Sequence, residues 1–197
     1  DLAAVIIDVH TGRTVAYVGN ASPESGRPGS KVDIASSPRS TGSVLKPILY
    51  CALMQEGTIL PYTLLPDIPV NINGFSPQNF DQKFAGAVPA SEALARSLNV
   101  PSVFMLRKYG VPRFKELLIR SGMTTLTRDA SHYGLSLILG GAEGRLDDMT
   151  RMYAAMSAFY QDSTFSGWDR KPEEWHLTDR MALHYTFDAL KEVNSPD

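Results

Sequence analysis

The sequence lacks the features that mark several classes of protein. It has one cysteine, Cys51, so no internal disulfide can form. No uninterrupted apolar stretch approaches the ~18 residues that cross a bilayer, and the first residues lack a basic start followed by an apolar core. We therefore expect a segment that does not span a membrane and whose fold rests on its apolar core.

An excess of charge of one sign is also missing. The chain of 197 residues has 19 basic and 21 acidic side chains, for a formal net charge of -2. Nucleic-acid binding normally leaves a basic patch or stripe, so we expect no nucleic-acid partner. With 43% hydrophobic and 20% charged residues, disorder, collagen and coiled coil are excluded, and a chain of this size can bury a single core.

Metal and phosphate motifs are absent from the sequence. Its histidines, at positions 10, 132, 176 and 184, show no ligand spacing with each other or with Cys51, which lies among apolar residues and is expected to be buried. Gly140-Gly141 lacks the Lys-Ser/Thr ending of a phosphate loop and predicts a tight turn. We interpret Asp147-Asp148 as the start of a helix rather than as a catalytic carboxylate pair.

The first residues predict a β-hairpin. Residues 2–9 form an apolar run broken only at Asp8, and a polar turn separates them from residues 14–18. The run predicts a strand that is buried on both faces. Residues 19–39 are rich in serine, glycine and proline and predict a loop.

Most of the remaining chain predicts helices. Apolar residues recur at the spacing of a buried helix over 43–55, and further helices are expected at 90–98, 102–109, 113–121, 146–160 and 177–193. Residues 58–86 are irregular and proline-rich, and a loop of this length often lines a site. Because two strands alone rarely make a stable sheet, either the helices hold the hairpin or the remaining strands lie outside this sequence.

Ser43 and Lys46 have the S-x-x-K spacing of serine acyl-transfer enzymes, which places the lysine one helical turn on, beside the hydroxyl. Chance alone would produce about 0.6 such pairs in this composition, so the motif needs context. Gly42 and Pro47 place Ser43 at a helix N-terminus, where unpaired N–H groups can stabilise an oxyanion. The alternative is an ordinary serine at a helix start followed by a solvated lysine.

Lys46 could activate Ser43 only as the neutral amine. Its pKa of ~10.4 would have to fall by about 3 through burial and neighbouring positive charge, which corresponds to roughly 4 kcal/mol. Ser97-Leu98-Asn99 follows a predicted helix and precedes Val100-Pro101, so we expect its hydroxyl and carboxamide to project from a constrained turn. They could relay a proton and either bind a substrate amide or hold the lysine, but a plain helix C-cap is the alternative.

Four ordered blocks place these motifs in a wider pattern. They are residues 37–47 (SPRSTGSVLKP), 74–81 (GFSPQNFD), 93–101 (ALARSLNVP) and 133–141 (YGLSLILGG). Together they resemble the transpeptidase domain of class A penicillin-binding proteins. The resemblance implies an α/β fold of the α+β type, the serine transpeptidase and β-lactamase-like fold, in which a five-stranded antiparallel sheet packs on helices and an all-helical subdomain borders the cleft.

The same resemblance implies roles for the motif residues. Ser43 would be the acylated nucleophile and Lys46 its base, whereas Ser97 and Asn99 would relay a proton and position the substrate. The substrates would be peptidoglycan stem peptides, a D-Ala-D-Ala donor and an amine acceptor, and β-lactam antibiotics would imitate the donor. No metal or organic cofactor is implied. The parent chain would carry a glycosyltransferase domain and a membrane anchor, and would work in the periplasm or at the extracytoplasmic face of the bacterial inner membrane.

The sequence departs from the family's pattern in one respect. The third motif, Lys-Thr/Ser-Gly, is missing, since no lysine is followed by Thr-Gly or Ser-Gly. We therefore expect residues 1–197 to be a partial transpeptidase domain that lacks its C-terminal strands, is poorly active or inactive alone, and exposes a sheet edge that can pair with another copy. A β-lactamase or a D-Ala carboxypeptidase would share the first two motifs, and a noncatalytic scaffold or β-lactam-sensing module on this fold is the alternative from another class.

Overall fold

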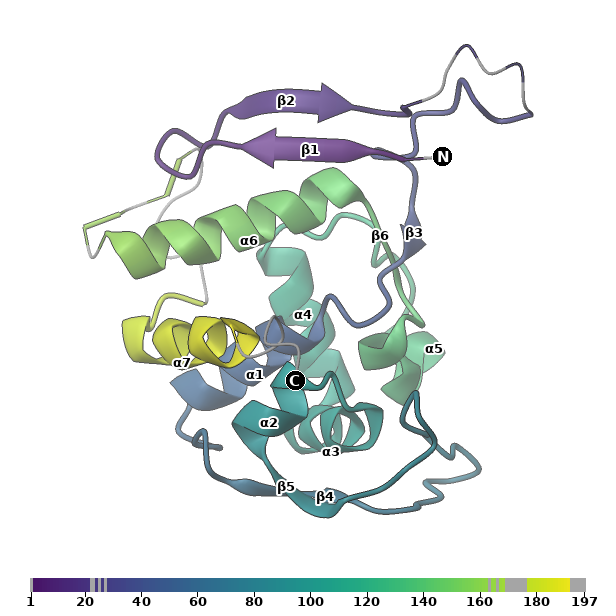
Figure 1. The fold of residues 1–197 in the computed structure, drawn as a ribbon, viewed down its shortest axis with the longest axis vertical. Helices are drawn as coiled ribbons and strands as arrows, with labels where there is room; N and C mark the ends of the chain where they lie inside the picture. The colour runs from purple at the N-terminus through teal and green to yellow at the C-terminus, as the bar shows by residue number, and fades with distance from the viewer. Residues whose placement is uncertain are drawn as a thin grey trace.

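Helices and short antiparallel strands make up the computed structural model, which describes residues 2–21, 24, 26, 28–162, 164–165, 167–168 and 177–191. Figure 1 shows a hairpin at one end of the molecule, helices in the middle and a second strand pair at the other end. The strands are β1 (Ala4–Ile7), β2 (Thr14–Val18), β3 (Arg39–Ser40), β4 (Leu64–Asp67), β5 (Gly86–Pro89) and β6 (Glu143–Gly144). The helices are α1 (Lys46–Gln55), α2 (Ala90–Ala95), α3 (Asn99–Tyr109), α4 (Val111–Arg120), α5 (Ala130–Tyr133), the 3-10 helix η1 (Gly134–Leu139), α6 (Leu146–Gln161) and α7 (Arg180–Lys191).

The predicted hairpin forms, but its predicted burial is wrong. β1 pairs antiparallel with β2 from Ala4 opposite Val18 to Ile7 opposite Thr14. Ile7 is buried, whereas Ile6 on the other face is 57% exposed. The physical reason is that α6 packs against β1 from one side only (Figure 1), so alternate residues of the apolar run face outward in the described part of the chain.

α1 is the central helix and contacts α2, α3 and α7. All but one of its ten residues are buried, and Pro47 lies in the first turn, where a missing N–H is tolerated. The helix begins at Lys46 rather than at the predicted Ser43. The intervening residues form tight turns, in which the N–H of Lys46 donates to the carbonyl of Ser43 at 3.1 Å.

Cys51 lies in the buried face of α1, as its apolar neighbours predict. Burial raises the pKa of its thiol to about 12. Because the thiolate is the nucleophilic form of cysteine, this side chain is inert at neutral pH and serves as a small apolar residue of the core.

The segment expected to be one long loop is closed by two strands. β4 and β5 pair antiparallel from Leu64 opposite Pro89 to Asp67 opposite Gly86. They were missed because Pro66 and Pro89 stand in the strands, and proline predicts edge strands or loops. β4 packs on α3 and α2, so the loop between the strands begins and ends against the helices.

The other predicted helices exist with shifted ends. α2 stops at Ala95, α3 begins at Asn99 and α4 begins at Val111, whereas the short helices α5 and η1 were not predicted. Asp147 and Asp148 stand in the first turn of α6, as predicted. α7 covers the last predicted helix as far as Lys191, and residues 192–193 lie outside the described residues.

None of the helices in the described ranges is both long and apolar enough to cross a bilayer.

Candidate active site

The turn that carries Ser43 is held by residues 140–144, at the end of the fourth sequence block and just after it. β3 pairs with β6, and the N–H of Thr41 donates to the carbonyl of Ala142 at 3.0 Å. The hydroxyl of Ser40 donates to the carbonyl of Gly140 at 2.8 Å. Ser43 itself is exposed, so its hydroxyl faces solvent while the residues on either side are anchored.

A tyrosine that the sequence analysis missed anchors the same turn. Tyr153, in the middle of α6, donates its hydroxyl to the carbonyl of Val44 at 2.6 Å. Burial raises the pKa of Tyr153, which keeps the phenol protonated and able to donate. No local signal could have revealed this bond, because the two residues are 109 positions apart.

Lys46 joins the first predicted motif to the second. Its side chain is 1% exposed, and Nζ donates to the carbonyl of Ser97 at 2.6 Å, the hydroxyl of Ser97 at 3.2 Å and Oδ1 of Asn99 at 2.7 Å. An ammonium group has three N–H donors, and all three are used here. The structure therefore brings Lys46, Ser97 and Asn99 into direct contact, so the carboxamide of Asn99 holds the lysine, one of the two roles considered for it.

Burial also changes the acidity of this lysine. Removal of the amino group from water lowers the pKa of Lys46 to about 8, because a charged group is poorly solvated in the interior. The change is close to the fall that a general base would need. A substantial fraction of the amine is therefore neutral near pH 8.

Ser43 and Lys46 do not form a hydrogen-bonded pair in this structure. Among the described residues, no hydrogen bond joins the Ser43 hydroxyl to Nζ of Lys46, whose donors all turn toward the second motif. The prediction that Ser43 stands at the helix N-terminus is also wrong by three residues. The turns over 42–45 and Pro47 in the first helical turn delay the start of α1.

Ser97 sits where a helix end normally takes glycine. The N–H of Ser97 donates to the carbonyl of Leu94, and the N–H of Leu98 donates to the carbonyl of Ala93, each at 2.9 Å. This is the hydrogen-bonding pattern of a Schellman motif. The φ angle of Ser97 is +52°, a left-handed conformation that disfavours side chains with a Cβ. Ser97 therefore both ends α2, as the residue just after its C-cap, and belongs to the predicted site. It holds a strained backbone while its oxygens face Lys46.

This strain predicts a stability difference between two variants. We expect Ser97→Gly to unfold at a higher urea concentration than Ser97→Ala, with a free energy of unfolding larger by about 1 kcal/mol. Both variants lose the same hydroxyl contact with Lys46, so the difference reports the backbone alone. Equal urea midpoints would show that the left-handed conformation carries no penalty in solution.

Asn99 is held from the loop between β4 and β5. Its side-chain Nδ2 donates to the carbonyl of Gln78 at 2.8 Å, and its backbone N–H donates to Oδ1 of Asn79 at 2.9 Å. The irregular, proline-rich sequence of this loop predicts that it lines a site, but it does not single out Asn79. The only available signal was its place in the block 74–81, within an otherwise irregular stretch.

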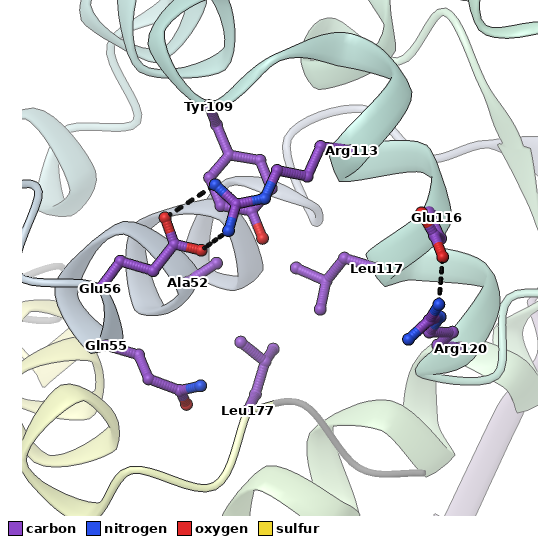
Figure 2. Close-up of a pocket in the computed structure, with 9 residues that line it drawn as sticks. All are labelled: Ala52, Gln55, Glu56, Tyr109, Arg113, Glu116, Leu117, Arg120 and Leu177. Carbon is purple, nitrogen blue, oxygen red and sulfur yellow. Dashed lines mark hydrogen bonds and ion pairs between the residues drawn. The ribbon is translucent and has the colours of Figure 1, made fainter.

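A separate pocket of about 280 Å³ lies between α1, α3 and α4 (Figure 2). Glu56 pairs with Arg113, whose guanidinium lies 4.6 Å above the ring of Tyr109, and Glu116 pairs with Arg120. None of the predicted site residues lines it. The described residues also hold no group of three or more histidine, cysteine, aspartate or glutamate side chains able to bind a metal ion.

The fold agrees with what comparison with known proteins finds. The family described as "Penicillin binding protein transpeptidase domain" matches residues 2–132. Since this match covers more than half of the chain, the protein belongs to the penicillin-binding protein transpeptidase family.

Individual relatives give the same result. The chain is 40% identical to penicillin-binding protein 1C of Escherichia coli (strain K12) over 156 residues, and 30% identical to penicillin-binding protein 1F of Bacillus subtilis (strain 168) over 165 residues. These matches cover 79% and 83% of this chain but only 20% and 22% of the relatives. The chain thus spans about a fifth of the length of these relatives.

Solved structures confirm the predicted fold class. PonA1 of Mycobacterium tuberculosis in complex with penicillin V superposes with a TM-score of 0.67 at 26% identity, covering 80% of this chain and 43% of that one. Penicillin-binding protein 1A of Haemophilus influenzae gives a TM-score of 0.64 at 25% identity, covering 78% of this chain and 23% of that one. The expected α/β transpeptidase fold and the class A resemblance are both confirmed. The described residues form three two-stranded antiparallel sheets rather than the five-stranded sheet that the resemblance implies.

Proposed function

We propose that this chain is the part of a peptidoglycan DD-transpeptidase that forms the acyl-enzyme. The observation that carries the proposal is the buried amino group of Lys46, which hydrogen-bonds to Ser97 and Asn99 and lies three residues after the exposed Ser43. A lysine with a lowered pKa beside a serine is an arrangement suited to nucleophilic catalysis. Penicillin, which PonA1 binds, would react with Ser43 in place of the stem peptide.

In the first step, neutral Lys46 accepts the proton of the Ser43 hydroxyl while Oγ attacks the carbonyl carbon between the two D-alanines. The C–N bond breaks, and the departing D-alanine takes the proton, relayed through the hydroxyl of Ser97. In the second step, the amine of a neighbouring stem peptide attacks the ester carbon. The attacking amine gives up one proton, which passes through Lys46 to Oγ of Ser43 as the Oγ–C bond breaks, and the new amide links the two peptides.

The contacts of Lys46 support its role as the base and that of Ser97 as the proton relay. A neutral amine has two N–H donors and one lone pair. The carbonyl of Ser97 and Oδ1 of Asn99 make the two shorter contacts, at 2.6 and 2.7 Å, and accept the two N–H bonds. The lone pair is then left for a hydroxyl, either that of Ser97 at 3.2 Å or that of Ser43 when a substrate is bound.

We also propose that residues 1–197 are a partial domain of a longer chain, with the Lys-Thr/Ser-Gly strand, the glycosyltransferase domain and the membrane anchor elsewhere in the parent. The exposed apolar residues of the hairpin support this proposal, since further strands and helices would cover Ile6, Val15 and Tyr17. The open hairpin edges could instead pair two copies of the chain. The parent would work in the periplasm or at the extracytoplasmic face of the bacterial inner membrane.

The test is intact-mass spectrometry after incubation with a penicillin. We expect one penicilloyl adduct per chain at Ser43, and no adduct on Ser43→Ala. If the 197-residue chain stays unmodified, the same experiment on a chain extended through the third motif decides the assignment. Continued absence of an adduct there would rule out the proposed enzyme. A chain that forms the penicilloyl adduct but transfers no acyl group from a D-Ala-D-Ala donor peptide to an amine acceptor would favour a β-lactam-sensing module instead.

A further inference from the structure

Asn79 is a buried carboxamide whose hydrogen bonds are all made. It is 3% exposed, and its Nδ2 donates to Oδ1 of Asp67 at 2.7 Å and to the carbonyl of Lys83 at 2.8 Å. Its Oδ1 accepts from the backbone N–H groups of Asn99 at 2.9 Å and Val100 at 3.3 Å. One side chain from the loop between β4 and β5 thus pairs both with β4 and with the start of α3.

The start of α3 needs this partner. The first N–H groups of a helix have no acceptor within the helix, and a polar side chain just before it usually supplies one. Leu98 occupies that position here, and its side chain cannot accept a hydrogen bond. The oxygen of Asn79 therefore replaces the missing cap from twenty residues away.

Asp67 fixes which way the carboxamide of Asn79 points. Asp67 is 1% exposed, and its second oxygen, Oδ2, accepts from the N–H of Ala85 at 2.9 Å. A carboxylate can only accept hydrogen bonds, so it must face the NH₂ group of Asn79. The oxygen of Asn79 is then directed at α3.

We propose that Asn79, oriented by Asp67, is a positioning residue that holds Asn99 against the amino group of Lys46. Asn99 is held twice by neighbouring loop residues, at its backbone by Asn79 and at its side chain by the carbonyl of Gln78. Its remaining oxygen accepts from Lys46 at 2.7 Å. The catalytic meaning of this role rests on the proposed function, but the contact and its effect on Lys46 do not.

Removal of the Asn79 side chain should therefore change Lys46 at a distance. The N–H groups of Asn99 and Val100 would lose their buried acceptor. Asn99 would then be held less firmly, and water would reach the amino group of Lys46. Since burial is what lowers the pKa of Lys46, that pKa should rise toward its ordinary value. A merely structural role would lower the free energy of unfolding without moving the titration of Lys46.

The experiment is an NMR titration of the 197-residue chain labelled with ¹³C at lysine Cε, with the Lys46 signal identified by its loss in Lys46→Arg. We expect a midpoint of about 8 in the unmodified chain and a midpoint higher by at least one pH unit in Asn79→Ala. The matched control is Ser102→Ala, which removes a buried hydroxyl that donates to the carbonyl of Leu98 at 2.6 Å in the same helix turn. This control should keep the original midpoint.

Asp67→Asn provides a second test that changes no side-chain volume. The new carboxamide cannot accept from both Asn79 and Ala85 in their present places, so the orientation of Asn79 is lost and the midpoint of Lys46 should rise. Simple removal of a negative charge would lower that midpoint, so the sign separates positioning from electrostatics. This variant also keeps the proposal testable if Asn79→Ala does not fold.

Two results would overturn the proposal: an unchanged or lowered midpoint in Asp67→Asn, or equal midpoints in folded Asn79→Ala and Ser102→Ala. Neither measurement uses acylation. A missing penicillin adduct would therefore count against the proposed function while leaving the role of Asn79 to the titration.

Discussion

Arginine in place of lysine at position 46 is expected to lower the rate of Ser43 acylation by a penicillin by about 10²–10⁴-fold. The guanidinium keeps the positive charge and the N–H donors that face Ser97 and Asn99, but it cannot lose a proton at any accessible pH. Lys46→Arg therefore removes the base while retaining a cation. Time courses with a fluorescent penicillin measure the rate, in whichever of the 197-residue and extended chains forms the adduct.

The pH dependence of the same rate gives a sharper test. Below the pKa of about 8, the neutral fraction of Lys46 grows about tenfold per pH unit, so the rate should rise with pH and level off above 8. Lys46→Arg should show no such rise. Lys108→Arg, at an exposed position near the end of α3, is the matched control and should behave like the unmodified chain. Full acylation of Lys46→Arg would show that another group accepts the proton.

The local sequence pattern predicts the parts of this site that lie within one element or one short turn. The spacing of apolar residues predicts α1. The S-x-x-K pattern of Ser43 and Lys46 and the S-x-N pattern of Ser97 and Asn99 identify the two motifs. Their meeting could be expected from the family resemblance, but the contact between Lys46 and the oxygens of Ser97 depends on how α1 packs against α2 and α3.

The contacts that hold the motifs in place lie beyond such patterns. Tyr153 reaches Val44 across 109 residues, and Asn79 caps a helix that begins twenty residues later. Neither residue is unusual in its own segment, so composition and periodicity carry no sign of its partner. The predicted start of α1 and the predicted burial of β1 on both faces were wrong for a related reason. Tertiary contacts, rather than apolar content, decide where a helix begins and which face of a strand is covered.

A single methyl group added at Gly140 should damage the fold beside the candidate site. Its φ angle is +94°, and an added Cβ would lie 2.6 Å from Oγ of Ser40 and 3.0 Å from the backbone of Gly42. Left-handed backbone costs about 1 kcal/mol for a residue with a Cβ, and forced overpacking costs roughly 1–3 kcal/mol. We expect Gly140→Ala to lower the free energy of unfolding by about 2–4 kcal/mol in urea titrations.

Gly57→Ala separates the two causes and links the damage to the site. Gly57, just after α1, also has a positive φ, +65°, but an added Cβ there meets no heavy atom within 4 Å, so this variant should lose only about 1 kcal/mol. Because the contacts of Gly140 are with the turn that carries Ser43, the folded fraction of Gly140→Ala should also be acylated more slowly, whereas Gly57→Ala should not. Equal losses of stability in the two variants would contradict the close approach of Gly140 to Ser40. An unchanged acylation rate in folded Gly140→Ala would show instead that the turn can shift without disturbing Ser43. The packing of the fourth sequence block on the first would then matter for stability alone.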